Sequence, residues 1–152
     1  VAEGHTIAVH DYRHIPYSKQ NRLQLVQSLD YTRRRIKEII GQEASVYVRS
    51  PGGRLSPESE NYLKTKGYKH VHWNLNGEVL EIEPAKYLNH LKDEIAKGRR
   101  GIILMHDRNA SVYLQAMIDF LKANRISVMA LEEWERVYSL PSTPMTGHEG
   151  TF

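Results

Sequence analysis

Two histidines near the start of the chain are spaced as metal ligands often are. His10 and His14 are four residues apart, which in a helical turn places both imidazoles on one side, within reach of one divalent ion. Two surface histidines on a loop would give the same spacing. His106 directly follows a very apolar run, where an imidazole is either held by a neighbour such as Asp107 or used as an acid or base.

An arginine and a glycine-rich turn form a second candidate. Arg49 is followed by Ser50-Pro51-Gly52-Gly53. A guanidinium at the end of a strand can orient a carboxylate through two hydrogen bonds, although an ordinary surface arginine is the simpler interpretation. Proline followed by glycines can expose backbone N–H groups to an oxyanion, or can merely form a turn.

The elements that position these residues alternate between strands and helices. Periodicity predicts strands at 6–9, 45–48, 68–73, 101–105 and 126–129, separated by helices at 21–40, 57–66, 85–97 and 111–123. A further helix is expected to begin near Leu131. This alternation implies an α/β fold with a parallel sheet, either open or part of a barrel. Because loops at the carboxyl ends of parallel strands converge on one face, we expect the candidate residues to meet there.

Composition excludes several classes of protein. The 152 residues (17.6 kDa) are 40% hydrophobic, as in a globular domain with a real core, and not as in a disordered or collagen-like chain. A net charge of only +3 does not favour nucleic acid as a partner. The longest apolar run, 102–105, is far shorter than the roughly 18 residues of a membrane span. Since there is no cysteine, any metal must be held by histidines and carboxylates.

Four segments together resemble the motifs of polysaccharide deacetylases, the NodB-homology or carbohydrate esterase family 4 domain. Gly-His-Thr-Ile-Ala-Val-His-Asp-Tyr-Arg-His at 4–14 resembles their metal-binding histidine motif, and Arg-Ser-Pro-Gly-Gly at 49–53 their Arg-x-Pro motif. Trp-Asn-Leu-Asn at 73–76 resembles their Trp-(Asp/Asn)-x-(Asp/Asn) segment, and Leu-Met-His-Asp at 104–107 matches their Leu-x-His-Asp motif. Order and spacing agree from about Val1 to Leu131.

The resemblance implies a distorted (β/α) barrel of the NodB type over residues 1–139, followed by a tail at 140–152. It implies a hydrolase that removes N-acetyl groups from amino sugars of chitin-like or, with this Pro-Gly-Gly variant, peptidoglycan chains. The polysaccharide substrate implies an extracellular or cell-wall location in a bacterium. No membrane span and no nucleic acid are expected.

The resemblance also implies a role for each motif residue. The divalent metal, usually zinc and in some members cobalt or nickel, would be held by His10 and His14. The backbone N–H of Gly52 would stabilise the oxyanion, and His106 would protonate the departing amine. Arg49 would tether the catalytic base, Leu104 would line the acetyl pocket, and Trp73 would wall the sugar groove or pack in the core.

One family motif has no counterpart here. A strand ending in Thr-Phe-Asp-Asp, which carries the base and the third metal ligand in the family, does not precede the histidine motif, and neither Asp11 nor Asp107 takes its place in the pattern. The barrel is therefore expected to be incomplete, without its first β-α-β segment. A cleaved chain, a truncated chain and a degenerate homologue are three explanations.

Two of these explanations have a consequence for function. The first favours a separate N-terminal fragment, or a segment swapped from a partner, that completes the barrel. The last favours a non-catalytic glycan-binding or scaffold domain. The other histidines fit no ligand spacing with the motif pair and are expected to be strand or surface residues: His5, His70, His72 and His90.

Overall fold

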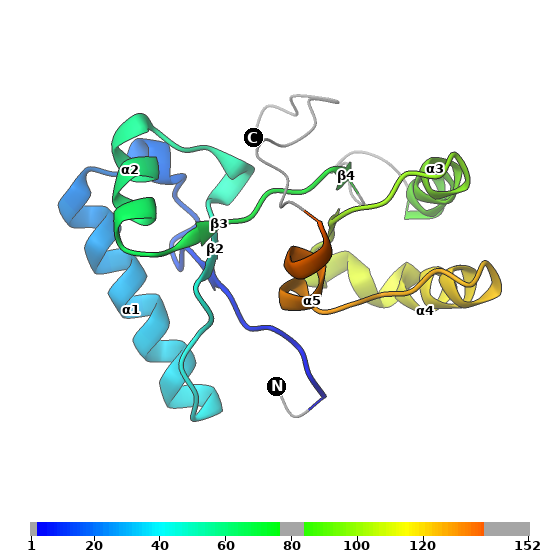
Figure 1. Cartoon of the computed structure of the whole chain (residues 1–152), viewed down its shortest axis with the longest axis horizontal. Helices are drawn as coiled ribbons and strands as arrows, with labels where there is room; N and C mark the ends of the chain where they lie inside the picture. The colour runs from blue at the N-terminus through cyan, green and yellow to red at the C-terminus, as the bar shows by residue number, and fades with distance from the viewer. Residues whose placement is uncertain (1–2, 77–83, 139–152) are drawn as a thin grey trace. The chain divides into compact units, whose positions relative to one another are not determined.

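The computed structural model describes residues 3–76 and 84–138, which fall into two compact units (Figure 1). Among the described residues, the first unit comprises 3–72 and 130–138, and the second comprises 73–76 and 84–129. The predicted tail at 140–152 lies outside the described residues.

In the first unit the described residues form a three-stranded parallel sheet in the order β1 (Val9–His10), β2 (Tyr47–Arg49) and β3 (Lys69–His70). His10 is in register with Arg49, and Val48 with His70. The three strands therefore end at residues with titratable side chains, which are His10, Arg49 and His70. The helices of this unit are α1 (Arg22–Ile40), α2 (Pro57–Thr65) and α5 (Leu131–Val137), with two short 3-10 helices at Tyr17–Lys19 and Pro51–Gly53.

Local sequence explains both long helices of this unit. Helix α1 begins after Asn21, whose side chain accepts from the Gln24 N–H in a capping box, and it ends at Gly41 in the left-handed conformation (φ 72°). Helix α2 begins after Ser56, with Pro57 at its first position. These caps supply partners for backbone groups that a helix end leaves unpaired.

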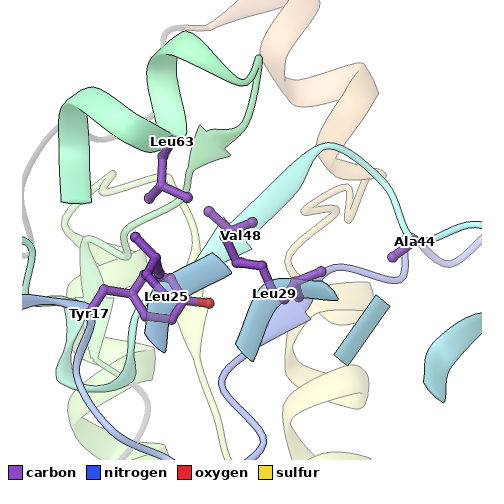
Figure 2. Packing of buried hydrophobic residues seen from close by; sticks show 7 residues of the cluster. Tyr17, Leu25, Leu29, Ala44, Val48 and Leu63 are labelled. Carbon is purple, nitrogen blue, oxygen red and sulfur yellow. The ribbon is translucent and has the colours of Figure 1, made fainter. Parts of the chain in front are cut away.

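The core of the first unit lies between the sheet and these helices. Leu25 and Leu29 of α1 and Leu63 of α2 pack with Val48 of β2, together with Val9, Tyr17 and Ala44 (Figure 2). Each of the three leucines is at most 2% exposed. Burying one such side chain contributes about 1.5–3 kcal/mol to the stability of the fold. Because Val9 and Val48 belong to the cluster, its packing holds β1 and β2 in place.

The second unit contains two parallel strands, β4 (Leu75–Asn76) and β5 (Ile103–Leu104), and the helices α3 (Pro84–Ala96) and α4 (Asp107–Ala123). Its core consists of Leu75, Leu91, Ile95, Met117 and Leu121. Before β4, the Asn74 side chain accepts from the Ile102 N–H (2.8 Å) and donates to the Arg100 carbonyl (2.9 Å). This clasp joins the segments that lead into the two strands.

The structure confirms the expected helices and corrects some of the strands. Helices occur in each predicted helical segment, although α4 begins at Asp107, where an acidic side chain favours a helix start. The strand predicted at 126–129 is wrong, because this stretch pairs with no strand among the described residues, and Val128 is 80% exposed. The segment 68–73 is a strand only at Lys69–His70, and β4 was not anticipated. No helix in the described parts is long and apolar enough to cross a membrane.

Candidate functional site

His10 stands at the carboxyl end of β1 with one ring nitrogen engaged. Its Nδ1 lies 2.6 Å from the carbonyl oxygen of Arg49, the residue in register with it on β2. A carbonyl only accepts, so Nδ1 carries the proton and Nε2 keeps its lone pair. Burial lowers the pKa of His10, against the Arg49 carbonyl contact, which raises it. The neutral ring with a bare Nε2 is the form that binds a metal.

His14 is brought back beside His10 by a tight turn. Its N–H donates to the Asp11 carbonyl (2.9 Å), and its backbone is left-handed (φ 56°), which is uncommon for a residue with a side chain. The two imidazole centroids are 5.2 Å apart with the planes at 74°. The two rings are therefore neighbours, although the segment between them is a turn and not a helix, and their role as ligands stays a prediction.

Asp11 holds the backbone between the two histidines. Its carboxylate, on a residue only 4% exposed, accepts from the N–H groups of Arg13 (3.1 Å) and Ile15 (2.8 Å). It also accepts from the Gln20 amide (3.2 Å) and the Ser28 hydroxyl. Burial alone would raise the pKa of Asp11, but these four hydrogen bonds lower it below its ordinary value. The carboxylate therefore stabilises the turn.

Ser50 anchors the loop that follows Arg49. Its hydroxyl accepts from the Tyr17 N–H (2.9 Å) and donates to the Arg54 carbonyl (2.7 Å), while its own N–H donates to Nε2 of His70 (3.0 Å). Ser50 is fully buried. It thus joins the carboxyl ends of β2 and β3 to the segment after the histidine turn.

His70 and His72 belong to this network and are not surface histidines. Because His70 Nε2 accepts from Ser50, the proton of the neutral ring is on Nδ1, which donates to His72 Nε2 at 2.9 Å. Burial, with smaller contributions from His72 and Arg49, lowers the pKa of His70 to about 3. Sequence spacing does not indicate the contact between Ser50 and His70, since these residues are 20 positions apart and meet only through the register of β2 with β3.

The other expected site residues lie partly in the loop after β2 and partly in the second unit. Arg49 is half-buried at the end of β2, and Gly52 is exposed with a left-handed backbone (φ 62°). In the second unit, Trp73 precedes β4, Leu104 ends β5, and His106 is the N-cap of α4. All three of these are partly buried. The structure therefore brings together His10, His14 and Arg49, with Gly52 in the adjoining loop.

The donor set fits part of a metal site. In the ranges 3–76 and 84–138 no group of three or more His, Asp or Glu side chains is placed to hold an ion. Two neutral imidazoles can supply two of the four ligands that zinc usually takes. The Asp11 carboxylate is already engaged in the turn, so the remaining ligands would come from water or from outside the described residues.

Comparison with known proteins connects this geometry with a family. The family model for polysaccharide deacetylase matches residues 1–71, which hold both histidines and the Arg49 loop. This segment, residues 1–71, is part of a polysaccharide deacetylase domain. The chain is 25% identical over 146 residues to the peptidoglycan-N-acetylmuramic acid deacetylase PdaA of Bacillus subtilis, covering 92% of this chain and 56% of that relative. The chain thus spans about half the length of the curated relative.

Solved structures show the same fold. The chitin deacetylase of the fungus Colletotrichum lindemuthianum superimposes with a TM-score of 0.75 at 20% identity, over 87% of this chain and 62% of that one. A CE4 family pseudoenzyme from Bacillus anthracis superimposes with a TM-score of 0.65 at 18% identity, over 83% and 44%. The expected fold class, an incomplete α/β barrel of the NodB type, is confirmed by these neighbours.

Proposed function

We propose that this chain is part of a metal-dependent polysaccharide N-deacetylase. The observation that carries the proposal is the edge-to-face pair of His10 and His14, with Nδ1 of His10 held by the Arg49 carbonyl so that Nε2 is left for an ion. The family match over residues 1–71 supports it. Zinc is the proposed ion, with cobalt or nickel as alternatives, because two imidazoles suit these metals.

The proposed reaction is hydrolysis of the acetamide of an amino sugar. A bound divalent ion supplies Lewis acidity toward the amide carbonyl and makes its water more acidic. In this proposal the N–H of Gly52 stabilises the carbonyl oxygen as it gains negative charge. His106 donates a proton to the departing amine nitrogen. Leu104 and Trp73 contact the acetyl group and the sugar ring.

Within the described residues, the proposal assigns no carboxylate as the catalytic base. The described carboxylate nearest in sequence to the histidine pair, Asp11, is used by the turn. We propose that a polypeptide segment outside the described residues supplies the base and a third ligand, and that Arg49 orients this carboxylate.

The proposed substrate is a bacterial cell-wall glycan, handled outside the cell. The support is the similarity to a deacetylase whose name specifies peptidoglycan and N-acetylmuramic acid. A non-catalytic glycan-binding or scaffold domain is the second candidate, since one of the structural neighbours is a pseudoenzyme.

Release of acetate from peptidoglycan fragments and from N-acetylglucosamine oligomers, with added zinc and then with a chelator, separates the two candidates. The chain should be assayed alone and joined to a Thr-Phe-Asp-Asp segment from a relative. We expect zinc-dependent release from the joined form, and loss of at least about 100-fold in His14→Ala. His5→Ala is the control, because His5 is exposed and lies outside the pair. Glycan binding with no release by the joined form would favour the non-catalytic domain.

A further inference from the structure

Two tyrosines form an exposed aromatic pair beside the histidine turn. Tyr12, in the turn between His10 and His14, is 52% exposed, and Tyr31 of α1 is 38% exposed. Their ring centroids are 4.3 Å apart with the planes tilted by 40°. Neither ring is part of the buried core cluster of the first unit. An aromatic pair left in water gains only part of the free energy that burial would give it, so folding alone does not explain its position.

An arginine lies over each of these rings. The guanidinium carbon of Arg13 is 5.3 Å from the centroid of Tyr12, and that of Arg34 is 5.6 Å from the centroid of Tyr31. Arg13, Tyr12, Tyr31 and Arg34 therefore form a continuous series, which we call the tyrosine–arginine row. Exposed tyrosine and arginine side chains are the types most enriched where proteins bind other molecules.

The charge of the row is only weakly neutralised. Within the described residues Arg13 makes no ion pair at 4.0 Å or less. Arg34 reaches Glu38 only at 3.9 Å, with 67% of its side chain exposed. Glu38 is closer to Arg35, at 2.5 Å. The row thus presents partly exposed tyrosine rings flanked by guanidinium groups that can still donate to a carboxylate partner.

This combination suits a sugar that carries an acid. The apolar face of a pyranose ring stacks on an aromatic face, and a guanidinium binds a carboxylate through two parallel hydrogen bonds. A neutral amino sugar would use only the rings, and a non-sugar anion would use only the arginines. A carboxylate-bearing sugar uses both.

We propose that the tyrosine–arginine row is a subsite for a carboxylate-bearing sugar of the glycan chain. Tyr12 is two residues from both His10 and His14, so its Cα lies within about 7 Å of theirs along the backbone. The proposal places a sugar stacked on the row next to a sugar at the histidine pair. This inference rests on the proposed function for the identity of the glycan, and it assigns the row a preference for acidic over neutral chains.

Direct binding to the 152-residue chain tests the subsite without any turnover. The probes are a tetrasaccharide of alternating N-acetylglucosamine and N-acetylmuramic acid, and an N-acetylglucosamine tetramer of equal length. Binding is measured by calorimetry and by NMR shifts of the tyrosine ring protons. We expect the acidic probe to bind at least about fivefold more tightly and to shift the rings of Tyr12 and Tyr31.

Substitutions on α1, outside the histidine turn, show which side chains cause the preference for the acidic probe. Arg34→Gln should weaken the acidic probe about fivefold and leave the neutral one unchanged, whereas Tyr31→Ala should weaken both. Arg22→Gln is the matched control, since Arg22 lies over the Tyr62 ring (5.4 Å) on the same helix and should not affect either probe. If Tyr31→Ala does not fold, Arg34→Gln and the ring shifts in the unmodified chain still test the proposal.

The possible results separate this inference from the proposed function. Equal affinity for the two probes, or an Arg34→Gln variant that binds both as the unmodified chain does, overturns the subsite even if acetate is released. The expected binding pattern supports the subsite even if the zinc-loaded joined form releases no acetate, and in that case only the hydrolytic function fails.

Discussion

The Asp11 carboxylate gives the most demanding test of how the histidine turn is built. In Asp11→Ala, two backbone N–H groups, the Gln20 amide and the Ser28 hydroxyl lose their acceptor. A hydrogen bond to a charged group contributes about 1.5–3 kcal/mol, but the four are not additive and the donors regain some water. We therefore expect the free energy of unfolding to fall by about 3–4 kcal/mol, a large part of the stability of a domain.

Two further variants isolate the cause. Asp11→Asn keeps one acceptor oxygen but turns an NH₂ group toward donors, so it should lose about 2 kcal/mol. Asp30→Ala removes an exposed carboxylate of α1 and should change stability by less than about 0.5 kcal/mol. Urea denaturation followed by circular dichroism measures all three. A loss in Asp11→Ala as small as that in Asp30→Ala would refute the role assigned to the turn.

Three other outcomes follow from the described contacts. Because burial lowers the pKa of His70 to about 3, the contribution of His70 to stability is present above about pH 6.5 and is lost as pH falls from there toward 3. Partial exposure of the ring limits this loss to about 1–2 kcal/mol between pH 7 and 5. Urea titrations at the two pH values should show a smaller loss in His70→Gln. A slope unchanged in His70→Gln would contradict this assignment. In Gly101→Ala the added carbon would lie 1.8 Å from Oδ1 of Asn74 and open the clasp, so about 2–3 kcal/mol should be lost in the same assay. Gly52→Ala meets no atom within 4 Å and should cost only about 1–2 kcal/mol for its left-handed backbone; equal losses in the two variants would be the contrary result.

The parts of the fold that sequence predicts are those with local causes. Helices α1 and α2 are predicted from their periodicity, and their caps are local too, since Asn21 and Ser56 each pair with a residue only three positions away. The strand expected at 126–129 has a suitable composition, but a strand also needs a neighbour to pair with, and none is present among the described residues. Composition alone carries no information about that neighbour.

The candidate site divides in the same way. The His10–His14 spacing is local, so the turn could be anticipated. The Ser50–His70–His72 network depends on the register between β2 and β3, which no spacing in the sequence reports. The sequence pattern does not favour Asp11 as a catalytic carboxylate, and its four hydrogen bonds agree with this, since they already use its oxygens.

Zinc binding to the chain tests the central claim most directly. Titration with zinc, followed by NMR of the imidazole protons, should show one ion per chain that shifts the rings of His10 and His14, and binding should be lost in His14→Ala but kept in His5→Ala. Zinc that leaves both rings unshifted, or that binds equally well to His14→Ala, would contradict the claim that this histidine pair is the metal site of a polysaccharide deacetylase domain.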